Sequence, residues 1–175
     1  MRERNPPPGS PGTVTLRTDL RPGDIGCVVR LHGVVYAREC GFDPTFEAYV
    51  AGPLAAFARA GSARERLWLA ERHGQIVGCI AIVAASPRVA QLRWFLVDPS
   101  ARGTGVGRRL LLEAVAFCQA CGYRSIMLWT VSGLAAAAHL YQSAGFRKVA
   151  EKPGRKWGVA VIEEQYRLTL PRPPA

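Results

Sequence analysis

A glycine-rich turn between a strand and a helix is the segment of this 175-residue chain best suited to bind a ligand. The apolar residues 92–97 favour a buried strand, and Arg102-Gly103-Thr104-Gly105-Val106-Gly107 precedes an apolar pattern of helical spacing that runs to residue 117. Glycine lacks the Cβ atom that keeps a ligand away from the backbone. The first turn of a helix adds unpaired N–H groups and the positive end of its dipole. The pattern predicts an anion site, which suits phosphate.

Three interpretations of this loop compete. A dinucleotide-binding GxGxxG needs glycines two and then three apart, whereas Gly103, Gly105 and Gly107 are evenly spaced. A P-loop needs Gly-Lys-Ser/Thr, which does not follow here. A purely structural loop with a helix cap is the third alternative, and the loop alone leaves it open.

The order of strand and helix patterns favours an α+β domain. Apolar residues predict strands at 13–17, 66–71, 75–84, 92–97, 125–130 and 161–170, and another strand beginning at 147. Helical spacing covers 25–39, 45–60, 108–117 and 134–144, with Asp24 expected to cap the first helix. Because a helix crosses between strands 92–97 and 125–130, we expect these two strands to be parallel in a largely antiparallel sheet.

Two motifs in this order resemble the GNAT family of N-acetyltransferases. Val97-x-Pro99 with Arg102-x-x-Gly105-x-Gly107 resembles the family's acetyl-CoA signature, and Ala137-x-x-Leu140-Tyr141-x-x-x-Gly145-Phe146 resembles its second half. The resemblance covers about residues 13–170, and we expect tails at 1–12 and 171–175, the first of them disordered. It implies the GNAT fold, a central mixed and mostly antiparallel sheet with one splayed parallel strand pair, flanked by helices.

The resemblance also implies acetyl-CoA as co-substrate and a primary amine as acceptor, of a small molecule or a peptide, with direct attack in a ternary complex. By position, the pantetheine arm and pyrophosphate would be bound by Leu96, Val97, Arg102, Gly103, Thr104, Gly105, Val106, Gly107 and Arg108. Many relatives have an asparagine at the position of Leu134, where it contacts the pantetheine. Trp129, Thr130 or Ser132 is expected to replace that contact, and Thr130 is the residue we place in the site.

Tyr141 occupies the position of the family's general acid. A phenol with a pKa of about 10 is protonated at neutral pH and can supply the proton that the departing thiolate needs. The alternative is simple core packing against Phe146. Many relatives use a glutamate on the preceding strand as base, but the corresponding residues here are Gln91 and Arg93, which cannot act as bases.

His32 is the candidate base on the acceptor side, because its reference pKa lies near 6.5; a structural role is the alternative. Arg93, Tyr36 and Phe42 are the candidate substrate-binding residues, and Arg93 would favour an acceptor that carries a carboxylate. A cationic amine could instead be attracted by the carboxylates of Glu39, Asp43 and Glu47.

Composition limits the other possibilities. The net charge of +10 invites nucleic acid, but the arginines are scattered and no basic block of five or six residues occurs, so we expect no nucleic-acid partner. No apolar run reaches about 18 residues, so no membrane partner is expected. Five cysteines, an odd number, predict a reducing cytoplasm, and Cys118-x-x-Cys121 lacks a second ligand pair, so no metal is expected.

The wider pattern from Gly23-Asp24 to Leu140-Tyr141 resembles the acetyltransferase domains of bacterial MarR–GNAT fusion proteins, although the 175 residues contain no winged-helix pattern. A homodimer is compatible with the family but not required. The rival function is an acetyl-CoA-binding sensor or interaction module without turnover. It is favoured by the missing carboxylate at Gln91 and Arg93, and opposed by Tyr141.

Overall fold

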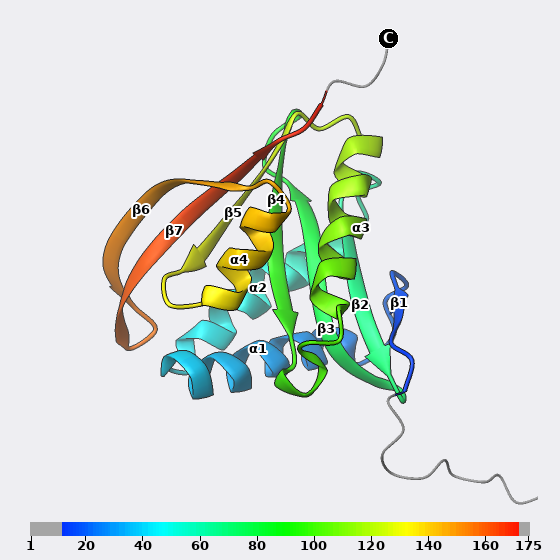
Figure 1. Ribbon diagram of the computed structural model, residues 1–175. Helices are drawn as coiled ribbons and strands as arrows, with labels where there is room; N and C mark the ends of the chain where they lie inside the picture. Colours follow the sequence, from blue (N-terminus) through cyan, green and yellow to red (C-terminus); the bar gives the residue numbers. More distant parts are fainter. Residues whose placement is uncertain (1–11, 172–175) are drawn as a thin grey trace, which may run out of the picture.

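A seven-stranded mixed sheet forms the centre of the protein, as the computed structural model in Figure 1 shows for residues 12–171. The strand order is β1-β2-β3-β4-β5-β7-β6. The predicted tails lie outside the described residues, except for Gly12 and Pro171. In chain order the elements are β1 (Thr15–Arg17), α1 (Asp24–Cys40), α2 (Thr45–Ala60), β2 (Arg66–Arg72), β3 (Gln75–Ala84), β4 (Val89–Val97), a 3₁₀ turn (Pro99–Ala101), α3 (Val106–Ala120), β5 (Ser125–Val131), α4 (Ala135–Ser143), β6 (Arg147–Lys156) and β7 (Val159–Thr169).

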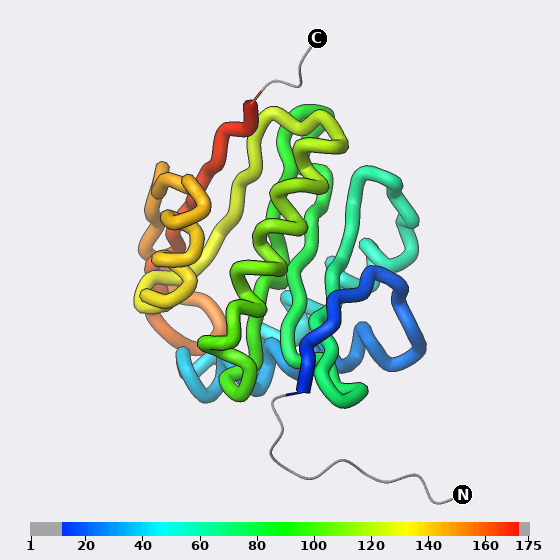
Figure 2. The backbone as a smooth tube through the Cα atoms, turned by 45° about the vertical axis from the view of Figure 1, so that its right-hand side comes forward, coloured from blue at the N-terminus to red at the C-terminus, as the bar shows by residue number. Residues whose placement is uncertain are grey.

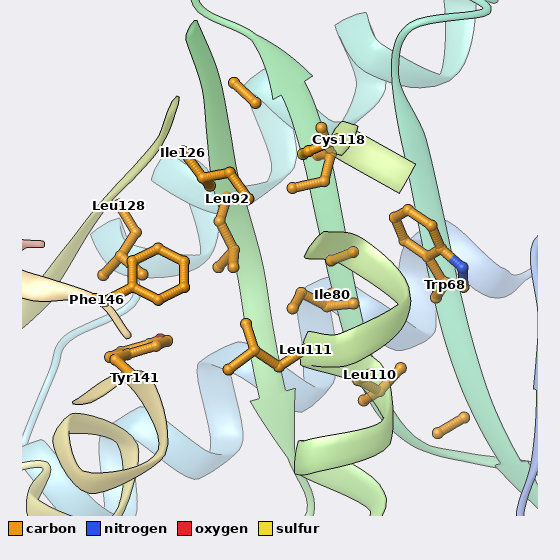
Figure 3. Close-up of a cluster of buried hydrophobic side chains, with 14 of the residues drawn as sticks. Trp68, Ile80, Leu92, Leu110, Leu111, Cys118, Ile126, Leu128, Tyr141 and Phe146 are labelled. Atoms are coloured by element: carbon orange, nitrogen blue, oxygen red, sulfur yellow. The ribbon is translucent and has the colours of Figure 1, made fainter. Parts of the chain in front are cut away.

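Helices cover both faces of the sheet. In Figures 1 and 2, α3 and α4 lie on one face, and α1 and α2 lie on the other. Each face has its own apolar core. The core under α3 and α4 includes Leu110, Leu111, Tyr141 and Phe146, which are labelled in Figure 3. The core under α1 and α2 includes Val28, Leu54 and Trp94. Such a layered domain needs a sheet that is apolar on both sides, and the long apolar runs in β3 and β4 supply it.

A bulge in β4 changes which face its side chains occupy. Trp94 has a left-handed backbone conformation with φ 47°, and the register with β3 shifts between Cys79 and Ala81. Before the bulge, Leu92 packs in the core under α3 and α4; after it, Leu96 packs in the core under α1 and α2. An extra residue in a strand produces this change of face, because successive side chains alternate.

The parallel pair β4–β5 is short and then separates. Its register extends only from Val89 opposite Ser125 to Gln91 opposite Met127. Beyond that point β4 follows β3 and β5 follows β7, each through an antiparallel ladder. The two strands therefore diverge toward their carboxyl ends, and the expectation of one splayed parallel pair in a mostly antiparallel sheet is confirmed.

The start of α1 differs from what the sequence predicts. Asp24 does not cap α1: Gly23 is the cap residue, and no side chain caps the helix. Asp24 is instead the first helical residue, and its carboxylate accepts hydrogen bonds from the Arg21 backbone N–H at 2.6 Å and from the Arg17 guanidinium.

The late strand β6 includes Pro153, which is tolerated because β6 is an edge strand. No helix of residues 12–171 is long and apolar enough to cross a membrane.

Arg17 joins β1, α1 and β2 through two carboxylates. Its guanidinium donates two hydrogen bonds to Asp24, each 2.8 Å long, and one of 2.8 Å to Glu71. The side chains of Arg17 and Asp24 are only 12% and 8% exposed, so little water can replace either partner. The guanidinium lowers the pKa of the Asp24 carboxyl. A buried bidentate pair therefore fixes the start of the acceptor-side helix.

We expect Asp24→Asn to lower the free energy of unfolding by about 2 kcal/mol, because Arg17 keeps Glu71 but loses its better-buried partner. Urea denaturation measures the change. Asp19→Asn is the matched control, since the Asp19 carboxylate is 60% exposed and its loss should cost less than about 0.5 kcal/mol. Equal effects of the two substitutions would show that burial of the Arg17 pair is unimportant.

Candidate active site

The gap between β4 and β5 opens into a pocket of about 100 Å³. Helices α1 and α2 wall it on one face of the sheet, and Tyr141 of α4 reaches it from the other. The turn between β6 and β7 contributes Trp157. Among the residues predicted as functional, the structure brings six together in this lining: His32, Tyr36, Phe42, Arg93, Thr130 and Tyr141.

The end of β4 directs backbone groups that β3 does not use toward the gap. Asp98 donates its backbone N–H to Val77 of β3, 2.8 Å away, and the Leu96 carbonyl lies close to Gly78 of the same strand. Backbone groups alternate in direction along a strand, so the N–H and C=O of Val97 point away from β3 and toward the β5 side. Of the two predicted backbone sites, Val97 therefore faces the gap, whereas Leu96 uses its backbone for the sheet.

The glycine-rich loop has the open surface that an anion site needs. Gly103 and Gly105 have φ of 74° and 81°, and a Cβ atom at either position would meet nothing within 4 Å. Positive φ requires glycine here, and the space above the backbone is free for a ligand. Gly107 differs, because a Cβ there would lie 3.3 Å from the Leu140 side chain. Its role is close packing between α3 and α4. Val106 is buried and begins α3, while the Thr104 hydroxyl donates to the Ala101 carbonyl at 2.7 Å.

The two predicted arginines of the loop differ in their contacts. Arg102 forms an ion pair of 2.8 Å with Glu39 at the end of α1, and its Nε donates to the Val97 carbonyl at 3.1 Å. Its guanidinium thereby joins the loop to the acceptor-side helix. Arg108 is exposed in the first turn of α3. The open glycine backbone and the start of α3 fit a pyrophosphate, with Arg108 as the nearby positive charge.

Tyr141 is almost entirely buried, with 5% of its surface exposed, and lies beside Phe146 in Figure 3. Its ring packs against Phe95, Phe146 and Tyr166 at centroid distances of 5.7–6.0 Å. Its hydroxyl has no hydrogen-bond partner within residues 12–171. The only fully buried side-chain polar atom without a partner in that range is Arg64 Nε, so the Tyr141 hydroxyl reaches the open space of the pocket. Burial raises the pKa of the hydroxyl far above its usual value, which keeps it protonated.

His32 lines the opposite wall of the pocket in a neutral form. Its Nδ1 lies 2.8 Å from the Val28 carbonyl, and because a carbonyl can only accept, Nδ1 carries the hydrogen. Nε2 is therefore left with a free lone pair. Burial lowers the pKa of His32 from 6.5 to about 4, so the ring is uncharged at neutral pH. The group can accept a hydrogen bond, but it is a weak acceptor of a full proton.

Arg93 supplies the positive charge of the acceptor side. It is half-buried, and its guanidinium lies 4.9 Å from the centroid of the Trp94 ring. The bulge places these neighbouring residues on the same wall of the pocket. Each ion pair among residues 12–171 involves other cations, so no carboxylate in that range neutralises Arg93. An unpaired guanidinium in a pocket suits a carboxylate or another planar anion.

Aromatic rings form the outer part of the pocket. Phe42 is 5% exposed and packs against Tyr36, Phe46 and Trp157 at centroid distances of 4.8–5.5 Å. Burial also raises the pKa of Tyr36, so its hydroxyl stays protonated. The Asp43 backbone N–H donates to the Trp157 carbonyl at 3.0 Å and thus ties the α1–α2 turn to the β6–β7 turn.

The three acidic residues proposed to attract the amine do not line the pocket. Glu39 pairs with Arg102, the Asp43 carboxylate accepts a hydrogen bond of 2.9 Å from the Thr45 backbone N–H, and Glu47 lies against Gly33. The pocket carboxylate is Glu163 of β7, which pairs with Lys156 at 2.8 Å. Within the described part of the chain, no three His, Cys, Asp or Glu side chains could together hold a metal ion.

Sequence reasoning missed Glu163 and gave no role to Phe46, Tyr49 or Val50. For Glu163 a signal existed, because side chains alternate along β7 and Val161 packs in the core under α1 and α2. Strand β7 lies beside β5 only in the folded sheet, with Val131 opposite Glu163. Its approach to the pocket could not be read from spacing along the chain.

Comparisons with known proteins agree with this architecture. The model of the acetyltransferase (GNAT) family matches residues 34–146. An uncharacterized N-acetyltransferase of Schizosaccharomyces pombe is 32% identical over 115 residues, which are 64% of this chain and 70% of the yeast protein. A mycothiol acetyltransferase of Amycolatopsis mediterranei is 30% identical over 144 residues, 77% of this chain and 46% of that protein. The chain belongs to the GNAT acetyltransferase family.

Solved structures show the same fold at low sequence identity. The structure of yncA from Salmonella typhimurium with its cofactor acetyl-CoA superposes with a TM-score of 0.75 at 20% identity, covering 93% of this chain and 96% of that chain. The rat N-acetyltransferase family 8 member 3 is 36% identical over 89 residues. These residues are 48% of this chain but only 39% of the rat protein, so the chain spans less than half the length of this relative. The narrower resemblance to MarR–GNAT fusions stays a prediction.

We expect acid to destabilise the protein through His32. The unfolded ring takes up a proton near pH 6.5 and the folded ring only near pH 4, so stability present above pH 6.5 is lost as the pH falls toward 4. The free energy of unfolding should drop by about 2.5 kcal/mol between pH 7.5 and pH 4.5. Urea denaturation at several pH values measures it.

His32→Gln should remove most of this loss, whereas His139→Gln on the exposed side of α4 should not. The carboxyl groups of Asp24 and Asp98 have pKa values lowered from 3.8, so they contribute at lower pH. An equally steep loss in His32→Gln would refute the assignment.

Proposed function

We propose that this protein transfers acetyl from acetyl-CoA to a primary amine that enters from the side of α1 and α2. The observation that carries the proposal is the continuous pocket through the β4–β5 gap. It brings the Tyr141 hydroxyl from one face of the sheet into the same space as Arg93 and His32 on the other. The open glycines 103 and 105 and the gap-facing backbone of Val97 fit the pyrophosphate and the pantetheine arm.

Acetyl-CoA, when bound, supplies a thioester whose carbonyl carbon the neutral amine attacks, so that a C–N bond forms and the C–S bond breaks. The protein positions the two substrates, stabilises the developing charge and transfers protons. The backbone N–H of Val97 stabilises negative charge at the reacting oxygen. Burial keeps the Tyr141 hydroxyl protonated, and it donates its proton to the departing sulfur. The proton that the attacking nitrogen loses through water as the amide forms then restores the Tyr141 hydroxyl. None of the cysteines of the described residues lines the pocket, so we infer that no acetyl-enzyme forms.

The amine must lose a proton before it attacks. His32 Nε2 offers a hydrogen-bond acceptor but, with a pKa of about 4, does not hold the proton at neutral pH. The unpaired positive charge of Arg93 in the pocket disfavours a bound ammonium ion. We therefore infer that the proton passes to water, and that the pocket selects the amine already in its neutral form.

An acetyl-CoA sensor without turnover is the second candidate. It is favoured by one observation: the carboxylate that lines the pocket, Glu163, is paired with Lys156. A sensor would bind acetyl-CoA and release no CoA thiol with any amine. Measurement of acetyl-CoA binding by calorimetry, together with thiol release across amino acids, simple amines, polyamines and short peptides, separates the two candidates.

We expect Tyr141→Phe to lower kcat by about 100-fold or more, because the leaving thiolate loses its proton donor. Affinity for acetyl-CoA should change by less than about twofold, since the ring and its packing remain. The matched control is Tyr166→Phe, whose ring packs 5.7 Å from Tyr141 while its hydroxyl donates to Glu164. Unchanged turnover in Tyr141→Phe would exclude the acid role.

We expect Arg93→Gln to abolish a preference for acceptors that carry a carboxylate. The kcat/KM for alanine divided by that for ethylamine should fall about 30-fold, because the bound carboxylate loses its charged partner. Arg88→Gln removes the same charge from the exposed β3–β4 loop and should leave the ratio unchanged. An equal ratio in the wild type and in Arg93→Gln would refute carboxylate recognition by Arg93.

A further inference from the structure

Two aromatic side chains at the acceptor pocket leave much of their surface uncovered. Tyr49 is 48% exposed and Trp129 is 40% exposed. Among residues 12–171, the other large exposed apolar side chains are aliphatic and lie outside this pocket, whereas Tyr49 and Trp129 both line it. Exposed aromatic surface gathered at one cavity is a mark of a binding site.

Three separate elements bring these rings together. Tyr49 belongs to α2, Trp129 to β5, and Trp157 to the β6–β7 turn. The ring centroids of Tyr49 and Trp157 lie 5.2 Å apart. Trp157 has a left-handed backbone conformation with φ 49°, and its carbonyl accepts the hydrogen bond from the Asp43 backbone N–H. Trp129 stacks on no other ring of the described residues. One face of the pocket is thus prearranged, and Trp129 lacks an aromatic partner.

We propose that the acceptor is a primary amine carrying a single aromatic ring, which binds at the pocket mouth against Trp129 and the Tyr49–Trp157 pair. This inference rests on the proposed acetyl transfer and names its substrate class. The ring buries apolar surface that the protein leaves in water, and it adds the offset or edge contacts that aromatic pairs favour. The amine end then points toward the β4–β5 gap and Tyr141.

The size and charge of the pocket select a neutral ring over a second cation. The cavity of about 100 Å³ is of the same order as an apolar cavity of about 150 Å³ that binds benzene, so a ring of six atoms is the right scale. Aromatic walls also attract cations, but here Arg93 lines the pocket and Lys156 lies 5.7 Å from the Trp157 ring. The pocket carboxylate, Glu163, already pairs with Lys156. A polyamine would therefore meet the unpaired charge of Arg93, and the one carboxylate in the lining is already neutralised.

Matched acceptors test the inference with the full chain and acetyl-CoA. Phenylalanine, cyclohexylalanine and alanine share the amine and carboxylate and differ only in the side chain, while phenylethylamine lacks the carboxylate. We expect kcat/KM for phenylalanine to be about 30-fold or more higher than kcat/KM for alanine. We also expect it to be about threefold higher than kcat/KM for cyclohexylalanine. Phenylethylamine should likewise exceed ethylamine.

Variants locate the effect. Trp129→Leu and Tyr49→Leu should each lower the phenylalanine-to-alanine ratio about tenfold, with the acetyl-CoA affinity from calorimetry unchanged. Ile162→Ala is the control, because Ile162 is 43% exposed on β7 but does not line the pocket. It should leave the ratio unchanged.

The possible failures differ. If acetyl-CoA binds and alanine or ethylamine is acetylated as well as the aromatic acceptors, the aromatic inference is overturned and the acetyl transfer stands. If acetyl-CoA does not bind, or no amine releases CoA thiol, the proposed function is overturned, and the inference with it. A ratio that survives in both leucine variants also overturns the assignment to these rings.

Discussion

The separation of β4 from β5 is the constraint on which the rest of this site depends. Two parallel strands share a ladder only from Val89 to Gln91 and then follow different antiparallel neighbours. The divergence leaves the Val97 N–H without a strand partner, while the Val97 carbonyl accepts a hydrogen bond from Arg102, and it opens a passage through a sheet that helices cover on both faces (Figures 1 and 2). An unpaired backbone edge inside a protein is costly unless water or a ligand pairs with it. The separation of β4 from β5 therefore destabilises the unliganded protein and at the same time forms the binding site.

The bulge at Trp94 determines which side chains of β4 line the opening. Because it adds a residue to β4, Arg93 and Trp94 both line the acceptor pocket, and Leu92 and Leu96 pack on opposite faces of the sheet. A regular strand would have sent Arg93 and Trp94 to opposite faces. The bulge thus places a positive charge beside the gap while both cores remain filled. The backbone strain of a left-handed tryptophan is offset by its burial and by the Cys79 thiol, which donates to its carbonyl at 3.1 Å.

The acceptor pocket is assembled from segments far apart in the chain. The hydrogen bond from Asp43 to the Trp157 carbonyl joins the α1–α2 turn to the β6–β7 turn, and the Arg102–Glu39 pair joins the glycine loop to α1. Both contacts act on the acceptor-side helices, whose start is fixed by the Arg17–Asp24 pair. The two substrates of the proposed reaction therefore bind to parts of the molecule that are mechanically connected, although they lie on different faces of the sheet.

The sequence by itself determined the order of elements, the parallel relation of β4 and β5, and the loop from Arg102 to Gly107. These depend on local periodicity, on glycine's backbone freedom and on the short connections between neighbours. It also placed Tyr141 and Arg93 in the site, through a motif and a position on a strand. Only the tertiary structure decided that Asp24 pairs with Arg17 and that Leu96 serves the sheet. Likewise it alone brought Tyr49, Trp129, Trp157 and Glu163 to one pocket. The reason is physical: a pattern along the chain records which face of an element is apolar, whereas contacts between distant elements depend on register, bulges and packing, which are settled only when the whole sheet forms.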